Sequence, residues 1–160
     1  MHLDFEIAIL IIHSIGKRIF MNLRLQLDTT DIDWDRVVDI LQKVGMSYHT
    51  NEIHRRAFNN SHTVVFVFDE ENLIGFGRAL SDGEYQAALY DVAVLPSYQG
   101  KGIGKLIVQT IVKKTPHCNF ILYASPGKES FYEKENFRRM KTGMALFVDR
   151  ERMQKIGFTE

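Results

Sequence analysis

This chain of 160 residues contains one cysteine, three prolines and no net charge at neutral pH. Cys118 alone cannot build a disulfide framework or a cysteine metal site within one chain, so a reducing compartment is compatible with the sequence, and a small buried apolar side chain is expected. Because 20 basic residues balance 20 acidic ones, a nucleic-acid surface is not expected as the main binding site. With 45% apolar and 25% charged residues, the composition predicts one ordinary globular domain.

The sequence also lacks a long hydrophobic run. Its most apolar stretch, residues 5–12, is interrupted only by Glu6, and it is shorter than the roughly 20 residues that a membrane span requires. Lys17 and Arg18 follow this stretch, whereas a secretory signal carries its basic residues first. Met21 would serve equally well as a start. We therefore expect no membrane partner, a cytoplasmic location, an N-terminal extension at residues 1–20 that packs on the domain or on a partner, and the domain proper at residues 21–160.

Glycine is concentrated in residues 98–105, Tyr-Gln-Gly-Lys-Gly-Ile-Gly-Lys, between a predicted strand and a predicted helix. Glycine permits positive φ and leaves the backbone without Cβ atoms. The N–H groups of a first helical turn have no intrahelical partner, and the helix dipole adds partial positive charge there. Lys101 and Lys105 add full charges. The stretch therefore predicts a binding site for a phosphate or a pyrophosphate.

Two common phosphate loops do not fit this stretch. A P-loop has Ser or Thr after its Gly-Lys pair, whereas Leu106 follows here, and its first glycine position is occupied by Gln99. The dinucleotide pattern G-x-G-x-x-G fails in both registers, because its third glycine falls on Lys105 or on Ile107. Taken alone, the glycine cluster is also compatible with a left-handed loop that binds nothing.

The remaining sequence predicts a mixed order of elements. Apolar alternation predicts strands at residues 22–27, 63–68, 73–80, 85–95 and 120–124. Helical spacing predicts helices at residues 34–44, 51–60, 102–114 and 128–136. Thr50 is the expected N-cap of the second helix, Gly45 the expected stop of the first, and one or two last strands are expected within residues 137–147. This is a mixed α/β pattern, not a regular β-α alternation.

Residues 99–104 fit the pattern Q/R-x-x-G-x-G and resemble the coenzyme A pyrophosphate loop of the GNAT family of N-acetyltransferases. A second block, residues 131–137, looks like the family's F-Y-E-K-x-G-F, with Asn136 in place of glycine. Because Asn tolerates the left-handed conformation, the helix should still end there. The element order is similar to that of the family from about Met21 to Phe147. The resemblance implies an α/β fold with a mixed, mostly antiparallel central sheet flanked by helices.

The resemblance also implies which residues bind acetyl-CoA. The strand before the loop should offer main-chain groups to the pantetheine amides at Val92, Ala93 and Val94, although the two valine side chains also suit a core. Where other members carry an Asn near the coenzyme this chain has Ser125, which equally suits a helix cap. The loop residues implied in pyrophosphate binding are Gln99, Gly100, Lys101, Gly102, Ile103, Gly104 and Lys105.

Tyr132 matches the tyrosine to which the family assigns protonation of the departing coenzyme A thiolate. A phenol of pKa ~10 can donate to a thiolate whose conjugate acid has a pKa of ~8.5 without extreme tuning. A packing role on a short helix is the alternative.

The general base is harder to assign, because Ala88 and Phe120 stand where family members carry glutamates. Asp91 is the acidic residue nearest the expected pantetheine strand. We predict that it acts as a base, directly or through water, or as an anchor for the amine, and a purely structural role is equally open. The candidate lining of the acceptor pocket is Trp34, Tyr48, Phe76 and Arg78, with core packing open for the aromatic residues.

The sequence therefore predicts an N-acetyltransferase in which a neutral primary amine attacks the thioester of acetyl-CoA directly. Acetyl-CoA is the cosubstrate, no metal is expected because the histidines lack ligand spacing, and a homodimer is left open. The alternatives are a noncatalytic coenzyme A-binding module and a nucleotide-phosphate-binding regulatory protein. The acceptor is open among a small amine, an amino acid and a protein N-terminus.

Overall fold

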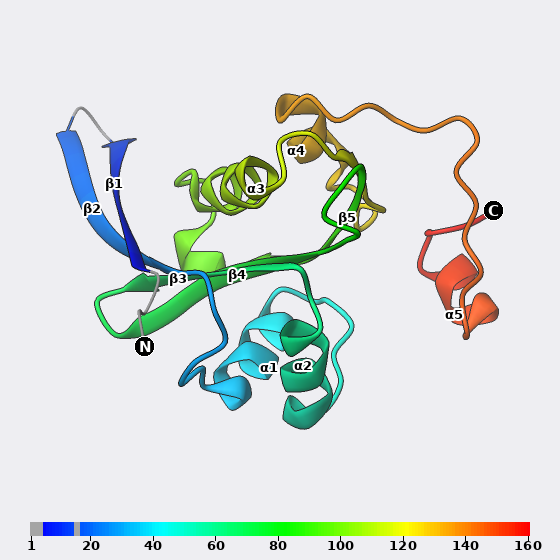
Figure 1. Ribbon diagram of the computed structural model, residues 1–160, viewed down its shortest axis with the longest axis horizontal. Helices are drawn as coiled ribbons and strands as arrows, with labels where there is room; N and C mark the ends of the chain where they lie inside the picture. Colours follow the sequence, from blue (N-terminus) through cyan, green and yellow to red (C-terminus); the bar gives the residue numbers. More distant parts are fainter. Residues whose placement is uncertain (1–4, 15–16) are drawn as a thin grey trace. The chain divides into compact units, whose positions relative to one another are not determined.

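The computed structural model describes the backbone of residues 5–14 and 17–160, and the side chains from Met21 onward. The chain forms two compact units, the first ending at Ile121 and the second running from Leu122 to Glu160. The first unit is built on a six-stranded sheet of order β1-β2-β3-β4-β5-β6 (Figure 1). Every neighbouring pair is antiparallel except β5 with β6, which is parallel. The predicted mixed, mostly antiparallel sheet is thus confirmed.

The elements follow the predicted order closely. The strands are β1 (Phe5–Ser14), β2 (Lys17–Gln26), β3 (Thr63–Asp69), β4 (Asn72–Ser81), β5 (Gln86–Val94) and β6 (Asn119–Ile121). The helices are α1 (Trp34–Lys43), α2 (Asn51–Asn59), the 3₁₀ turn η1 (Pro96–Tyr98), α3 (Ile103–Lys114), α4 (Glu129–Lys134) and α5 (Arg150–Lys155). Thr50 caps α2 as predicted, and Gly45 follows α1 with a φ of 72°.

Within the first unit, helices cover both faces of the sheet: α1 and α2 lie on one face and α3 lies on the other (Figure 1). This double cover explains why β3 is buried along almost its whole length. On the α1–α2 face, the rings of Phe58, Phe66 and Phe76 form a fully buried aromatic cluster with centroids 5.3 to 6.3 Å apart. The core of the first unit therefore consists of two apolar layers separated by the sheet.

Two glycines of β4 allow α3 to pack closely on the other face. A Cβ atom placed on Gly77 would come within 2.7 Å of Ile107, and one placed on Gly75 would come within 2.9 Å of the carbonyl oxygen of Ala93. Neither distance is compatible with a side chain. The close packing holds α3, and with it the glycine loop that precedes α3, in a defined position against β4 and β5.

The N-terminal segment takes part in the sheet rather than ending before it. β1 pairs with β2 from Phe5 opposite Gln26 to Ser14 opposite Lys17, whereas only Leu23–Gln26 of β2 pair with β3. The strand predicted to start at residue 22 thus starts at Lys17. Residues 1–4 and 15–16 of the expected extension lie outside the described residues, and the domain boundary at residue 21 stays a prediction.

The second unit differs most from expectation. The predicted last strands are wrong, because the backbone of residues 137–149 is neither helix nor strand. Apolar alternation gives a strand only where a neighbouring strand supplies hydrogen bonds, and this segment has no such neighbour in the described chain. Helix α5, capped by Asp149, was not predicted. Among the residues whose structure is described, no helix is long and apolar enough to cross a membrane.

Candidate functional site

The second half of β5 has one open edge. β6 pairs with β5 only at Gln86–Ala88, and in the described chain no strand pairs with this edge further along. On the opposite edge, the Leu95 N–H donates to the Ile74 carbonyl over 2.8 Å. Hydrogen-bonded and non-hydrogen-bonded pairs alternate in antiparallel sheets, so Val94, opposite Gly75, directs its main-chain N–H and C=O away from β4. The open edge therefore presents a donor and an acceptor at Val94.

The same alternation gives the main-chain groups of Ala93 the opposite direction to those of Val94. Ala93 stands opposite Phe76, one pair beyond Val94, and its main-chain groups therefore face β4. Of the three residues expected to bind pantetheine, Val94 meets the geometric requirement directly, whereas Ala93 does not offer its main chain to the open edge.

A β-bulge interrupts β5 just before this segment. Phe76 stands opposite Ala93 and Arg78 opposite Tyr90, so two residues of β5 face the single residue Gly77. Asp91 lies in the bulge with a φ of 53°, a left-handed value that is uncommon for a side-chain-bearing residue. Such backbone outliers persist only where the surrounding structure holds them in place, and they are found most often at functional sites.

Asp91 is held by an ion pair with Arg78. The Arg78 Nε donates to Asp91 Oδ2 over 2.5 Å, and only 15% and 21% of the two side chains is exposed. Arg78 also donates to Ser61 Oγ over 3.3 Å, and its guanidinium lies 5.3 Å from the centre of the Tyr90 ring. The contacts show that Asp91 has a structural partner, and its predicted role as base or anchor stays a prediction.

A buried histidine lies in α2, on the face of the sheet that α1 and α2 cover. His54 of α2 is 5% exposed, and its Nε2 accepts the backbone N–H of His49 over 3.0 Å. Burial lowers the pKa of His54, the nearby positive groups lower it further, and only the Asp91 carboxylate opposes them. The imidazole is therefore neutral at pH 7 and carries its proton on Nδ1. Sequence analysis did not single out this residue, because a lone histidine in a helix carries no spacing signal.

The glycine loop has the geometry of an anion site. Gly100 and Gly102 adopt positive φ values of 73° and 85°, as predicted. The first hydrogen bond of α3 runs from the Leu106 N–H to the Gly102 carbonyl over 2.9 Å, and no side chain of the described chain caps this end. The N–H groups of Ile103 and Gly104 therefore precede the first intrahelical bond and point out of the helix. These donors and the helix dipole suit a phosphate.

Two side chains at the start of the loop attach it to the sheet. The Gln99 amide donates to the Val94 carbonyl over 2.9 Å, and the Tyr98 hydroxyl donates to Asp69 Oδ2 over 2.8 Å. The Lys101 ammonium lies 4.9 Å from the centre of the Tyr98 ring. The loop is thus fixed on its N-terminal side by Tyr98 and Gln99, and on its C-terminal side by α3.

Tyr132 and Ser125 belong to the second unit. Tyr132 lies in α4, and its ring contacts those of Phe131 and Phe137, with centroids 4.9 and 5.9 Å away. Burial raises the pKa of Tyr132, so its hydroxyl is protonated at neutral pH. Asn136 follows the helix with a φ of 68°, which confirms the predicted left-handed conformation. Ser125 does not cap α4 with its side chain; instead its carbonyl accepts the Lys128 N–H over 2.9 Å.

The predicted acceptor-pocket residues divide between core and surface. Phe76 is fully buried, and the Trp34 ring packs on Phe58 with centroids 5.5 Å apart. Both aromatic residues therefore have the packing role that was left open for them. Tyr48 is half exposed, and Arg78 forms the ion pair with Asp91 described above.

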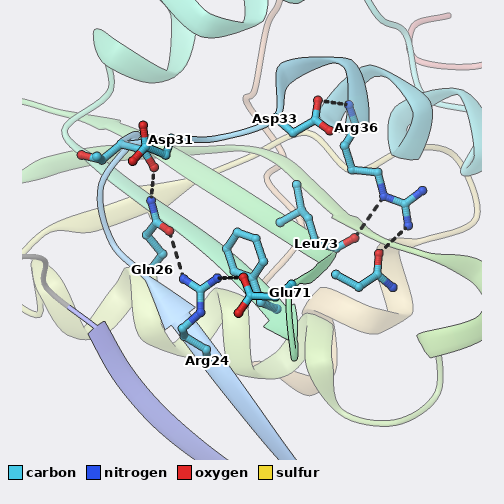
Figure 2. Close-up of a pocket in the computed structure, with 10 residues that line it drawn as sticks. Arg24, Gln26, Asp31, Asp33, Arg36, Glu71 and Leu73 are labelled. Carbon is cyan, nitrogen blue, oxygen red and sulfur yellow. Dashed lines mark hydrogen bonds and ion pairs between the residues drawn. The ribbon is translucent and has the colours of Figure 1, made fainter.

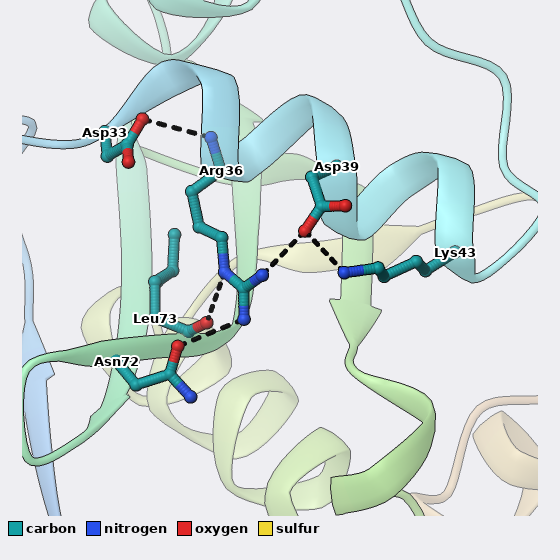
Figure 3. Close-up of polar contacts among 6 residues, drawn as sticks. All are labelled: Asp33, Arg36, Asp39, Lys43, Asn72 and Leu73. Atoms are coloured by element: carbon teal, nitrogen blue, oxygen red, sulfur yellow. Dashed lines mark hydrogen bonds and ion pairs between the residues drawn. The ribbon is translucent and has the colours of Figure 1, made fainter.

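A polar cleft of about 580 Å³ was not predicted. It lies between the end of β2, the start of α1 and the β3–β4 turn, and the ion pair between Arg24 and Glu71 stands in it at 3.8 Å (Figure 2). Arg36 donates to the Leu73 carbonyl over 3.3 Å and to Asn72 Oδ1 over 3.0 Å (Figure 3). The Arg36 contacts attach the β3–β4 turn to α1, and the charge of Arg36 is paired with Asp39 at 2.6 Å. No sequence motif marks the cleft, because its lining comes from segments far apart in the chain.

The described residues contain no group of three His, Cys, Asp or Glu side chains that could hold a metal ion.

Comparison with known proteins agrees with this geometry. The model of the acetyltransferase (GNAT) family matches residues 29–137, more than half of the chain. Serotonin N-acetyltransferase 2, chloroplastic, from Oryza sativa subsp. japonica is 30% identical over 137 residues, which cover 79% of this chain and 68% of that protein. The chain therefore belongs to the GNAT family of acetyltransferases, and the predicted class, acyltransferase, is the class of this family.

Two further relatives extend the comparison. The uncharacterized N-acetyltransferase ycf52-like protein of Prochlorococcus marinus is 32% identical over 113 residues, covering 66% of this chain but only 63% of its own length. The chain thus spans less than two thirds of that protein. A probable acetyltransferase of unknown function from meticillin-resistant Staphylococcus aureus has a TM-score of 0.70 and 26% identity, covering 79% of this chain and 98% of its own. The similar structure supports the same fold.

Proposed function

We propose that this protein is an acetyl-CoA-dependent N-acetyltransferase that transfers an acetyl group to a primary amine. The observation that carries the proposal is the continuity of β5 with the glycine loop: the main-chain groups of Val94 lie on an open strand edge, and the outward N–H groups of Ile103 and Gly104 follow within one loop. In coenzyme A a pantetheine arm is joined directly to a pyrophosphate, so the arm would meet the edge of β5 where the pyrophosphate meets the loop.

In this proposal the pyrophosphate binds at the loop of residues 99–105. The pantetheine amides then lie along the open edge of β5 as a short extra strand, with hydrogen bonds to Val94 and Val92. The Gln99 amide, which donates to the Val94 carbonyl, competes for the same acceptor or shares it, because a carbonyl oxygen has two lone pairs. Ser125 is a further proposed contact.

The chemistry is a direct acyl transfer. The amine nitrogen attacks the thioester carbonyl carbon, a base takes the proton that the nitrogen loses, and the C–S bond breaks to release the coenzyme A thiolate. Tyr132 donates its phenolic proton to this thiolate, a role suggested by its place in the block of residues 131–137; its pKa does not support the role, because burial raises that pKa and makes the phenol a weaker acid. Asp91 receives the amine proton, directly or through water, or anchors the amine; its ion pair with Arg78 fixes the position of the carboxylate for either role.

The acceptor is proposed as a primary amine. The name of the rice relative makes serotonin the first amine to test, and amino acids and peptide N-termini complete the panel. The cytoplasmic location and the homodimer stay predictions; the rice relative is named as chloroplastic, and a fluorescent fusion of the chain would decide the location.

The test is a thiol-release assay with acetyl-CoA and this panel of amines. We expect amine-dependent release of free coenzyme A, together with binding of coenzyme A by calorimetry. Binding without thiol release for any amine would favour the noncatalytic coenzyme A-binding module. Equal affinities for coenzyme A and for ADP, which lacks the pantetheine arm, would favour the nucleotide-phosphate binder and contradict the proposal.

A further inference from the structure

We propose that Tyr98 and Asp69 are positioning residues that hold the glycine loop in the conformation that binds the pyrophosphate of coenzyme A. This inference rests on the proposed function. It concerns two residues that do not themselves supply the loop donors: Tyr98 ends η1 and Asp69 ends β3.

The link between the two residues connects segments that are far apart in sequence. The Tyr98 hydroxyl donates to Asp69 Oδ2 over 2.8 Å, and the Tyr98 N–H donates to the Leu95 carbonyl over 2.8 Å. The hydrogen bond to Asp69 raises the pKa of Tyr98, and the phenol therefore keeps its proton and its role as donor at physiological pH. Tyr98 is thus held at both its backbone and its side chain.

The position of Tyr98 matters because the next residues can adopt many conformations. Gly100 has a φ of 73°, and no heavy atom of the described chain lies within 4 Å of a Cβ placed on it. Side-chain packing therefore does not hold the loop at Gly100, and its path depends on the residues on either side. Tyr98 also helps to position the charge of Lys101, because the Lys101 ammonium lies 4.9 Å from the centre of the Tyr98 ring.

Asp69 is in turn attached to the body of the domain. It begins the β3–β4 turn, and Arg36 of α1 holds the other end of that turn through Asn72 and the Leu73 carbonyl (Figure 3). The loop is thus connected through the turn to α1 on the opposite face of the sheet.

Charge alone would not favour an aspartate at this position. A carboxylate next to a site for a pyrophosphate repels the ligand, so a purely electrostatic effect predicts tighter coenzyme A binding when Asp69 is neutralised. A positioning role predicts weaker binding when the hydrogen bond is lost. The two explanations therefore differ in the sign of the effect.

The experiment measures the affinities of the full chain and its variants for coenzyme A and for pantetheine, which lacks the pyrophosphate. Tyr98→Phe and Asp69→Ala each remove the hydrogen bond, whereas Asp69→Asn removes the charge and keeps an acceptor. Tyr98→Phe also keeps the ring beneath Lys101, so it isolates the hydroxyl. Tyr85→Phe is the matched control, because Tyr85 is 63% exposed.

We expect Tyr98→Phe and Asp69→Ala to weaken coenzyme A binding by about five- to tenfold, the size of one hydrogen bond. The double variant should lose no more than either single variant. Pantetheine affinity should not change, and Asp69→Asn and Tyr85→Phe should bind coenzyme A at least as well as the unaltered chain.

Equal or tighter coenzyme A binding by Asp69→Ala would overturn the inference in favour of electrostatics. An equal loss of pantetheine affinity would overturn it in favour of a general loss of structure, which thermal unfolding of each variant would show independently. If the unaltered chain bound no coenzyme A, the proposed function itself would fail.

Discussion

The glycine loop and the Tyr132 helix both come from short sequence motifs, yet their surroundings differ. The loop joins β5 to α3, and α3 buries Ile103, Ile107 and Ile111 almost completely. In contrast, no residue of α4 is fully buried within its described residues 129–134, and Tyr132 itself is only partly buried. The comparison teaches that the conformation of the loop follows from packed neighbours, whereas α4 has few such neighbours, and the proposed role of Tyr132 is one that kinetics tests.

The segment after α4 extends this contrast. Met144, Leu146 and Val148 are almost fully exposed, at the alternate spacing of one strand face. A large apolar side chain stabilises the folded state only when a neighbour covers it and removes its surface from water. The first unit supplies such neighbours to its strands, and the second unit supplies none to this segment within the described chain.

The largest expected effect separates chemistry from binding. Tyr132→Phe removes one hydroxyl and little volume, so packing against Phe131 and Phe137 should persist. If the phenol protonates the thiolate, kcat on the best amine should fall by roughly 10²-fold while the affinity for acetyl-CoA stays constant. Steady-state kinetics and calorimetry would measure the two quantities. Tyr123→Phe in the same unit is the control; an unchanged kcat for Tyr132→Phe under rate-limiting chemistry would return Tyr132 to a packing role.

A smaller effect concerns the loop. Gly104 lies within α3, and Gly104→Ala places a methyl group where the first turn would approach the pyrophosphate. Coenzyme A affinity should fall by about tenfold, or ~1.4 kcal/mol, while the fold gains ~0.5–1 kcal/mol, because alanine favours a helix over glycine. Calorimetry and chemical denaturation give both numbers.

Gly45→Ala provides the reverse pattern as a control. Its φ of 72° makes alanine unfavourable there, so stability should fall without a change in coenzyme A affinity. Undiminished affinity in Gly104→Ala would contradict the assignment of the phosphate loop.

The smallest effect is expected from removal of residues 1–20. A chain that starts at Met21 keeps the buried Leu23 and Leu25 and the four residues of β2 that pair with β3. The truncation also removes β1, which pairs with Met21–Gln26, so the thermal unfolding midpoint should fall modestly while the coenzyme A affinity remains close to that of the full chain. Loss of both properties would show that the segment completes the core or an essential interface.

Local chemistry made several features predictable. Thr50 caps a helix because its hydroxyl meets a nearby N–H group, and Asn136 ends one because it tolerates positive φ. The strand that enters the glycine loop was predictable for the same reason, since its signals lie within a few residues of one another. The last strands were predicted wrongly because alternation reports a periodicity and not the presence of a partner strand.

The residues that hold the site together could not be predicted in this way. The pairs Arg78–Asp91 and Tyr98–Asp69 join residues 13 and 29 positions apart, and no local pattern marks either pair. The bulge at Asp91 depends on the register between β4 and β5, and the neutral His54 depends on its burial. Each of these features is decided by which segments the folded sheet brings together.

The sequence by itself determined the helices and strands from β3 to α4, the glycine loop and the resemblance to the family, because each depends on contacts within a turn or a short motif. The tertiary structure alone decided that the main chain of Val94 faces an open edge while that of Ala93 faces β4. It also decided that Asp91 meets Arg78, and that the loop is anchored to Asp69. The physical reason is that strand register and long-range hydrogen bonds are chosen by the packing of the whole sheet, and adjacent residues carry no record of that choice.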